Sequence, residues 1–330
     1  MRYVIVLATA LLIVDTASAH HSAIAFDQEQ VVVVEGVVTR FDWTNPHVYL
    51  FVKDADSVEW RIETDSTPIL TRSSWMHDSF APGDIVTIRA NPHRVSEKVR
   101  GLLLSVERPD GASLTSLGRS SGDDEAVSTT SAPSLEGVWR GDAASTRAFI
   151  AAFSDHPLTE KGETAKAEYD ETMNPGAACV PWTSPMLVAS RFYLRELEVQ
   201  DAAIVFRSEF YSAERTIHTD GREHPAGGER TNQGHSIGWW EGDTLVVDTR
   251  LFADHRSPIT STGVPSGALK HLIERYTLSD NGTQILIDIY LEDPEYLAEP
   301  FSGELAWHYS PHLEMVRFDC DPEVAMRFAQ

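Results

Sequence analysis

Strand-like runs joined by tight turns constrain this chain more than any other feature. In the second half, Glu241-Gly242-Asp243 separates two such runs, and Asp280-Asn281-Gly282 separates two more. Glycine and asparagine at these positions favour the tight turns that join antiparallel strands. Further runs at 203–210 and 315–318, with a helical patch at 159–173 that Thr159 can cap, fill the same region. We expect an antiparallel, lipocalin-like β-barrel over residues 135–330, in preference to a sandwich.

A second, smaller β region precedes this one. Strand-like runs lie at 31–39, 48–52, 58–63, 85–90 and 101–107, and residues 67–80 have near-helical spacing. Three strands, a short helix and two strands is the order of an OB-like barrel, which we expect over residues 20–112. Residues 113–134 are rich in Ser, Thr, Gly and Asp and predict a flexible linker. Proteolysis within 111–134 should therefore leave two resistant fragments.

The first residues have the pattern of an export signal. Residues 4–14 are mostly apolar and follow Arg2, and Ala17-Ser18-Ala19 provides the small residues of a cleavage site. We expect residues 1–19 to be a signal peptide, with His20 as the first mature residue and a periplasmic or secreted location. The alternative is an uncleaved N-terminal anchor.

The charge and the cysteine content of the chain indicate which partners to expect and whether a disulfide forms. The chain has 27 Lys and Arg residues against 50 Asp and Glu residues, a net charge of −23, which repels nucleic acid. No other apolar run approaches the length of a membrane span, so we expect no stable membrane insertion after cleavage. The partner that we expect is a small molecule. Cys179 and Cys320 are the two cysteines, and an oxidising compartment predicts that they form a disulfide.

Two passages resemble known families. The first comprises residues 20–22 (HHS), 36–38 (GVV), 41–48 (FDWTNPHV) and 82–84 (PGD), and it resembles a family of secreted bacterial proteins of unknown function, DUF6152. The second comprises residues 219–225 (TDGREHP) and 234–249 (GHSIGWWEGDTLVVDT), with Glu274-Arg275 and Asp293-Pro294. It is similar to a C-terminal module seen beside DUF6152 in uncharacterised secreted proteins. Neither resemblance implies an activity.

Histidines near the mature N-terminus suggest a metal. An N-terminal His20 could offer its amine and a ring nitrogen to copper, and His21 and His47 could complete the site. Copper is the one cofactor that the sequence suggests. The alternative is that His20 and His21 merely follow the cleavage site and that His47 caps a turn.

Polar residues of the second region suggest a site within its barrel. We predict catalytic roles for Asp220, Arg222, His224, His235 and Glu274, because imidazoles beside charged groups suit acid–base chemistry. Ser236, Trp240 and Arg275 are predicted to contact a ligand; of the adjacent Trp239 and Trp240, we expect one in the core. The alternative is that the charged groups and histidines form a structural network that closes one barrel end.

Function is less constrained than architecture. The sequence contains no Gly-x-Ser-x-Gly elbow, Walker loop, His-Glu-x-x-His or Cys-x-x-Cys motif. Our leading interpretation is a two-domain β protein that binds a small apolar or aromatic molecule in its C-terminal barrel. The alternatives are an acid–base lyase, isomerase or hydrolase in that barrel, with Glu274 and His235 facing one cavity, or a copper-binding protein.

Overall fold

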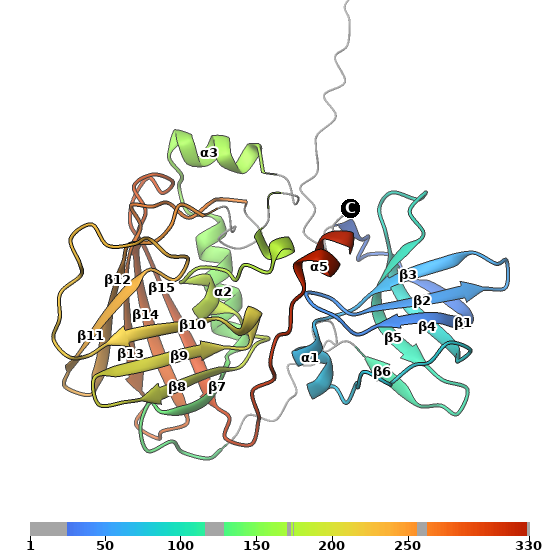
Figure 1. Cartoon of the computed structure of the whole chain (residues 1–330), viewed down its shortest axis with the longest axis horizontal. Helices are drawn as coiled ribbons and strands as arrows, with labels where there is room; N and C mark the ends of the chain where they lie inside the picture. The colour runs from blue at the N-terminus through green and yellow to red at the C-terminus, as the bar shows by residue number, and fades with distance from the viewer. Residues whose placement is uncertain (1–24, 116–128, 170–172, 174, 256–262, 329–330) are drawn as a thin grey trace, which may run out of the picture.

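A computed structural model describes residues 25–115, 129–169, 173, 175–255 and 263–328, which form two β-barrels (Figure 1). The mainly β architecture predicted from the sequence is confirmed. The signal peptide, His20 and His21 lie outside the described residues. None of the described helices has the length and apolar character needed to cross a membrane.

The N-terminal barrel has the strand order of an OB-like fold. Its elements are β1 (Val32–Asp42), β2 (Tyr49–Asp54), β3 (Glu59–Glu63), α1 (Thr67–Arg72), β4 (Ile85–Pro92), β5 (Arg100–Glu107) and β6 (Ser113–Thr115). Strand β1 pairs with β2 and β4, and a parallel pairing of β3 with β5 closes the five-stranded barrel. The short strand β6 adds to β5, within the stretch expected to begin the linker.

The C-terminal barrel is a meander of nine strands. These are β7 (Gly137–Gly141), β8 (Arg195–Val199), β9 (Ala203–Ser208), β10 (Glu214–His218), β11 (His235–Glu241), β12 (Thr244–Arg250), β13 (His271–Leu278), β14 (Gln284–Glu292) and β15 (Phe301–Tyr309). Between β7 and β8 lie α2 (Ala143–Ser154), α3 (Glu160–Ala167), η3 (Pro175–Ala178) and α4 (Met186–Ala189). The remaining elements are η4 (Phe210–Ser212) and α5 (Pro322–Phe328).

An odd number of strands has a topological consequence. A closed ring of nine strands cannot alternate direction throughout, and the one parallel pair is β10 with β11. Two parallel neighbours cannot be joined by a tight turn, so residues 219–234 must return along the barrel before β11 begins. This connection carries several of the predicted site residues.

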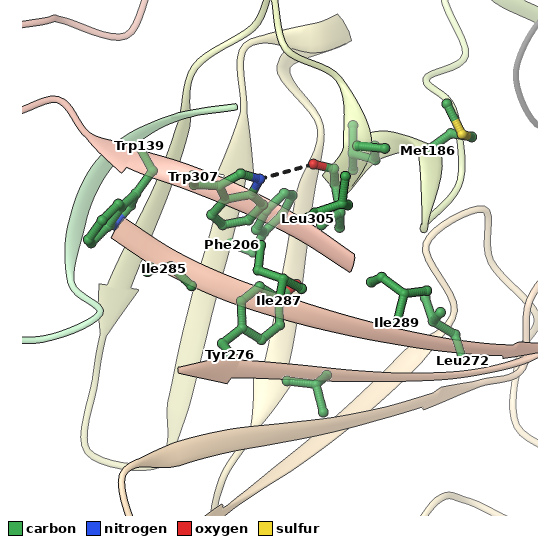
Figure 2. Packing of buried hydrophobic residues seen from close by; sticks show 14 of the residues in the cluster. Trp139, Met186, Phe206, Leu272, Tyr276, Ile285, Ile287, Ile289, Leu305 and Trp307 are labelled. Carbon is green, nitrogen blue, oxygen red and sulfur yellow. Dashed lines mark hydrogen bonds between the residues drawn. The ribbon is translucent and has the colours of Figure 1, made fainter. Parts of the chain in front are cut away.

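Each barrel has its own hydrophobic core. In the C-terminal barrel, inward side chains from the strands pack with residues of α2 and α4 (Figure 2). Trp307 Nε1 donates to the Val188 carbonyl at 3.1 Å, which fixes α4 against β15. The N-terminal barrel packs Leu50, Ile62 and Trp75, all 0% exposed. Side chains therefore fill much of the barrel interior in which we expected a small ligand.

Buried contacts join the two barrels through α1. Ile69 of α1 belongs to the core of the C-terminal barrel. Arg72 Nη1 contacts both carboxylate oxygens of Glu209 at 2.7 and 2.8 Å, and Ser66 Oγ lies 3.0 Å from the Tyr193 hydroxyl. The composition of the linker gave no indication of this interface.

The local predictions are mostly confirmed. The two hairpins are present, with Gly242 and Gly282 at positive φ in their turns, and Cys179 and Cys320 form a disulfide. Thr159 caps α3, but that helix ends at Ala167 and is shorter than predicted. The strand predicted at 315–318 is wrong, because this segment crosses η4 and bonds through its backbone to Glu209 and Ser212 instead of a neighbouring strand.

Candidate functional site

One end of the C-terminal barrel gathers histidines and carboxylates on its outer face. The start of β11, the end of β12, the start of β13 and the end of β14 meet there, because neighbouring strands run in opposite directions. His235 is paired with the exposed Arg250, and His271 with Glu292. Their side chains point away from the core, and the returning connection brings His224 against them.

Five of these side chains form a continuous hydrogen-bonded chain, which we call the histidine–carboxylate chain: Glu292, His271, Asp248, His224 and His235. Asp248 is its centre, with one carboxylate oxygen 3.0 Å from His224 Nε2 and the other 3.0 Å from His271 Nε2. His271 Nδ1 lies 3.2 Å from Glu292 Oε2. At the other end, the Nδ1 atoms of His224 and His235 are 2.9 Å apart.

With His224 neutral, the hydrogen bonds determine where the protons lie. A carboxylate only accepts, so both histidines beside Asp248 donate to it from Nε2. Neutral His224 then has an unprotonated Nδ1, which accepts from the Nδ1–H of His235. His235 Nε2 is consequently the unprotonated atom of that ring, and no described residue bonds to it. The chain thus holds His235 in one tautomer with a basic nitrogen available.

Electrostatics supports this assignment. Burial alone would raise the pKa of Asp248, but the hydrogen bond and positive charge of His271 outweigh it and lower the pKa to about 2. The hydrogen bond to Asp248 raises the pKa of His271, whose two nitrogens both face carboxylates. Burial is the largest cause that lowers the pKa of His235, and the neighbouring Arg222 cation lowers it further. His235 is therefore mostly neutral at pH 7, whereas the pKa of His271 lies above its usual value.

Two more predicted residues lie beside the His235 end. Asp220 and Arg222 form an ion pair with a 2.6 Å contact on the exposed connection, and the charge of Arg222 contributes to the lowered pKa values of His218 and His235. The His218 ring lies 5.2 Å from that of His235. Four of the five predicted catalytic residues, all except Glu274, are thus close together.

Glu274 lies on the other side of the barrel wall. It alternates with His271 along β13, faces inward and is 0% exposed. Arg215 Nη1 donates to it at 2.6 Å, and the Tyr276 hydroxyl donates at 3.0 Å. The expectation that Glu274 and His235 face one cavity is wrong, because their strand positions have opposite parity. The bonds of Glu274 match the structural network that we weighed as the alternative.

The predicted ligand-contacting residues do not converge. Ser236 is buried, with its Oγ 2.9 Å from Thr249 Oγ1 inside the barrel. Trp240 lies at the opposite end of β11, next to the hairpin turn. Both Trp239 and Trp240 are exposed, at 41% and 50%, so the expectation that one of them is a core residue is wrong. Alternation fails there because the last residues of β11 extend past the packed part of the barrel.

Arg275 lines a groove of about 580 Å³ on the outer face of β13–β15. Ser145, Ala148, Phe149 and Ala152 of α2 form one wall, and Asp288, Tyr290 and Glu304 form much of the other. The Tyr290 hydroxyl donates to Glu292 Oε1 at 2.8 Å. The groove therefore adjoins the Glu292 end of the histidine–carboxylate chain.

No group of three or more His, Cys, Asp or Glu side chains in the described part of the chain is arranged to hold a metal ion. His47 Nδ1 lies 3.1 Å from the Thr64 carbonyl oxygen and 3.8 Å from Glu63. Its supposed partners, His20 and His21, lie outside the described residues, so the copper site stays a prediction.

Comparison with known proteins identifies the first barrel. Residues 9–102 match a family described as "Family of unknown function (DUF6152)". This segment belongs to the DUF6152 family. The match ends within β5, so the C-terminal barrel and the histidine–carboxylate chain are a separate domain. No curated protein matches the chain.

Sequence reasoning missed several members of this site. His271, Glu292 and Asp248 were not among the predicted site residues. Their signal is positional: each lies at a strand end, at the parity opposite to that of the apolar core residues. That signal becomes useful only when the register of β11–β14 is known.

Proposed function

We propose that the C-terminal barrel is an acid–base enzyme in which His235 is the general base. The observation that carries the proposal is the 2.9 Å contact between His224 and His235, in a chain anchored on Asp248. A half-buried carboxylate, Asp248, orients one imidazole, which in turn orients a second and leaves it with one basic nitrogen. This is the general logic of a base held in the correct tautomer.

The proposed step moves one proton. His235 Nε2 removes a proton from a substrate or from an attacking water molecule, and the ring becomes an imidazolium. Its Nδ1–H bond to His224 strengthens, and the negative charge of Asp248 stabilises the new positive charge through His224. The proton then returns to the product from Nε2, which restores the neutral ring. Isomerase, lyase and hydrolase reactions all use this cycle.

Position supports a role in chemistry rather than in folding. His235 and His224 are only partly buried on the outer face, whereas the Arg215–Glu274 pair is almost fully buried in the core. Partly exposed titratable groups with shifted pKa values are typical of functional sites. The nearby Asp220–Arg222 pair adds a cation that helps to keep His235 neutral.

Turnover of p-nitrophenyl acetate by the full chain tests the proposal, because this ester responds to any accessible general base or nucleophile. We expect a rate that rises with pH through a midpoint below 6.5, as His235 becomes neutral, and then reaches a plateau. His235→Ala should abolish the turnover, and Asp248→Asn should reduce it by at least tenfold. Exposed His312 provides the control, since His312→Ala should leave the rate unchanged.

A stability measurement separates catalysis from structure. If His235 acts in catalysis, His235→Ala should change the thermal midpoint little. If the histidine–carboxylate chain only supports the fold, the same change leaves its hydrogen-bonding partners unpaired and lowers the free energy of unfolding by about 1–3 kcal/mol. A large fall in the midpoint, or equal ester turnover by wild-type protein and His235→Ala, would contradict the proposal.

The other functional predictions are kept as proposals. Binding of a small apolar or aromatic molecule inside the barrel requires movement of the core side chains in Figure 2. Export to the periplasm or cell exterior is supported by the signal-like N-terminal residues. Copper binding at His20 is supported by the sequence alone, and adding one alanine before His20 should weaken it strongly.

A further inference from the structure

Arg195 is a buried cation without a hydrogen-bonding partner. It lies on β8, its side chain faces the barrel interior, and it is 0% exposed. None of its three guanidinium nitrogens bonds to any described residue. Its guanidinium carbon lies over the face of Trp307, 4.9 Å from the ring centroid.

The other buried cations of the C-terminal barrel and its interface have anionic partners. Arg72 pairs with Glu209 at 2.7 Å and Arg215 pairs with Glu274 at 2.6 Å. Lys270 interacts electrostatically with buried Asp293 and donates to the Ser184 carbonyl at 2.6 Å, whereas Arg195 interacts with the charge of Glu209 without any hydrogen bond to it. Among the described residues of this barrel, Arg195 is the buried cation whose charged group has no hydrogen-bonding partner. Burial of an unpaired charge costs several kcal/mol, so its place in the core needs a compensating partner.

The barrel's own carboxylates cannot supply this partner. Both oxygens of Glu209 accept from Arg72, and the same oxygens accept from the backbone N–H groups of Leu194 and Val316 at 2.8 and 2.9 Å. Each oxygen of Glu274 accepts one hydrogen bond, from Arg215 or from Tyr276, and Arg195 donates to neither. Desolvation lowers the pKa of Arg195 to about 9, which still leaves it positively charged at neutral pH.

The surroundings indicate what such a partner must be. The guanidinium is a planar fork, and its geometry matches a planar carboxylate with two parallel hydrogen bonds. The backbone also approaches it closely, since a Cβ at Gly141 would lie 2.8 Å from the Ser190 carbonyl oxygen and 3.2 Å from Arg195 Nη1. The neighbouring core is closely packed with Trp307, Phe206 and Tyr276, so the partner must be small.

We propose that the C-terminal barrel binds a small carboxylate at Arg195, with two hydrogen bonds from the guanidinium and the Trp307 ring as one wall. The site lies inside the barrel and is independent of the proposed base on its outer face. Binding of the anion would supply the missing negative charge and stabilise the folded state by mass action.

Thermal unfolding of the full chain in acetate tests this proposal, with chloride added to keep the ionic strength constant. We expect the midpoint to rise with acetate concentration and to saturate. Arg195→Met should abolish the rise, and Arg195→Lys, which keeps the charge but loses the fork, should weaken the apparent affinity by at least tenfold. Arg207→Met is the matched control, since Arg207 lies on the outward face of β9 and pairs with surface carboxylates.

Each outcome decides the proposal. Equal stabilisation by acetate and chloride would overturn the carboxylate assignment. An acetate response that persists in Arg195→Met, or is absent from wild-type protein, would overturn the site. If Arg195→Met does not fold, the tenfold weakening in Arg195→Lys remains the test. His235→Ala should retain the full acetate response, so failure here is distinguishable from failure of the proposed function.

Discussion

Replacement of Glu209 by Gln should destabilise both barrels together. Glu209 is 1% exposed, lies just after β9 and joins three separate segments. It accepts from Arg72 of α1, from the Leu194 N–H before β8 and from the Val316 N–H of the C-terminal segment. Gln has almost the same shape, so the change removes charge and one acceptor without opening a cavity.

The magnitude follows from these contacts. An amide has one acceptor oxygen, and its NH2 group would face one of the two backbone N–H donors. Arg72 would lose the charge that offsets its burial. Breaking one partner of a buried ion pair costs about 3–5 kcal/mol. At about 2–4 °C per kcal/mol for a domain of 150–250 residues, we expect the thermal midpoint to fall by about 10 °C.

Differential scanning calorimetry measures this effect and also whether the barrels unfold as one unit. Glu214→Gln is the control, because Glu214 is largely exposed, pairs with Arg207 and should cost about 0.5 kcal/mol or less. A loss below 1 kcal/mol for Glu209→Gln would refute the claim that this carboxylate holds the interface together.

Three further outcomes follow. Mass spectrometry of the unreduced protein should find no free thiols at Cys179 and Cys320, and replacing both by Ala should cost up to about 5 kcal/mol, since the bridge closes 141 residues. The raised pKa of His271 should add stability that is complete below pH 6.5 and is lost as the pH rises through the raised value. The lowered pKa of Asp248 should add stability that is present above pH 3.8 and is lost as the pH falls to about 2. Thermal midpoints measured against pH check both, because the first dependence should flatten in His271→Asn and the second in Asp248→Asn. Cleavage within 111–134 should give two fragments that still co-elute in gel filtration, because the α1 interface holds them, and separate elution would show that it does not.

The strands could be predicted because their signals are local. Period-two alternation and glycine turns located β12, β13 and β14 to within one or two residues. Helix α2 was missed, because most of its apolar residues are alanines, only Phe149, Ile150 and Phe153 are large, and its burial depends on packing against β15. The predicted strand at 315–318 failed for a related reason: apolar residues bury against Glu209 and η4 without joining a sheet.

Part of the candidate site was predictable, because some of its residues lie next to strands that have local sequence signals. His224 and His235 were found as polar residues near strands, but sequence cannot assign them to the outer face, because that requires the register with β12 and the direction of the 219–234 connection. Glu274 was grouped with them for lack of this information. Arg195 gave no signal in the sequence, since its isolation depends on every nearby carboxylate being occupied.

The protonation state of His235 tests the central claim most directly. We predict that 15N NMR of the full chain at pH 7.5 shows Nδ1 protonated and Nε2 unprotonated in His235, and that Asp248→Asn alters this pattern while leaving exposed His312 unchanged. A proton on Nε2 of His235 in the wild-type protein would contradict the account, because no basic nitrogen would then remain for the proposed chemistry.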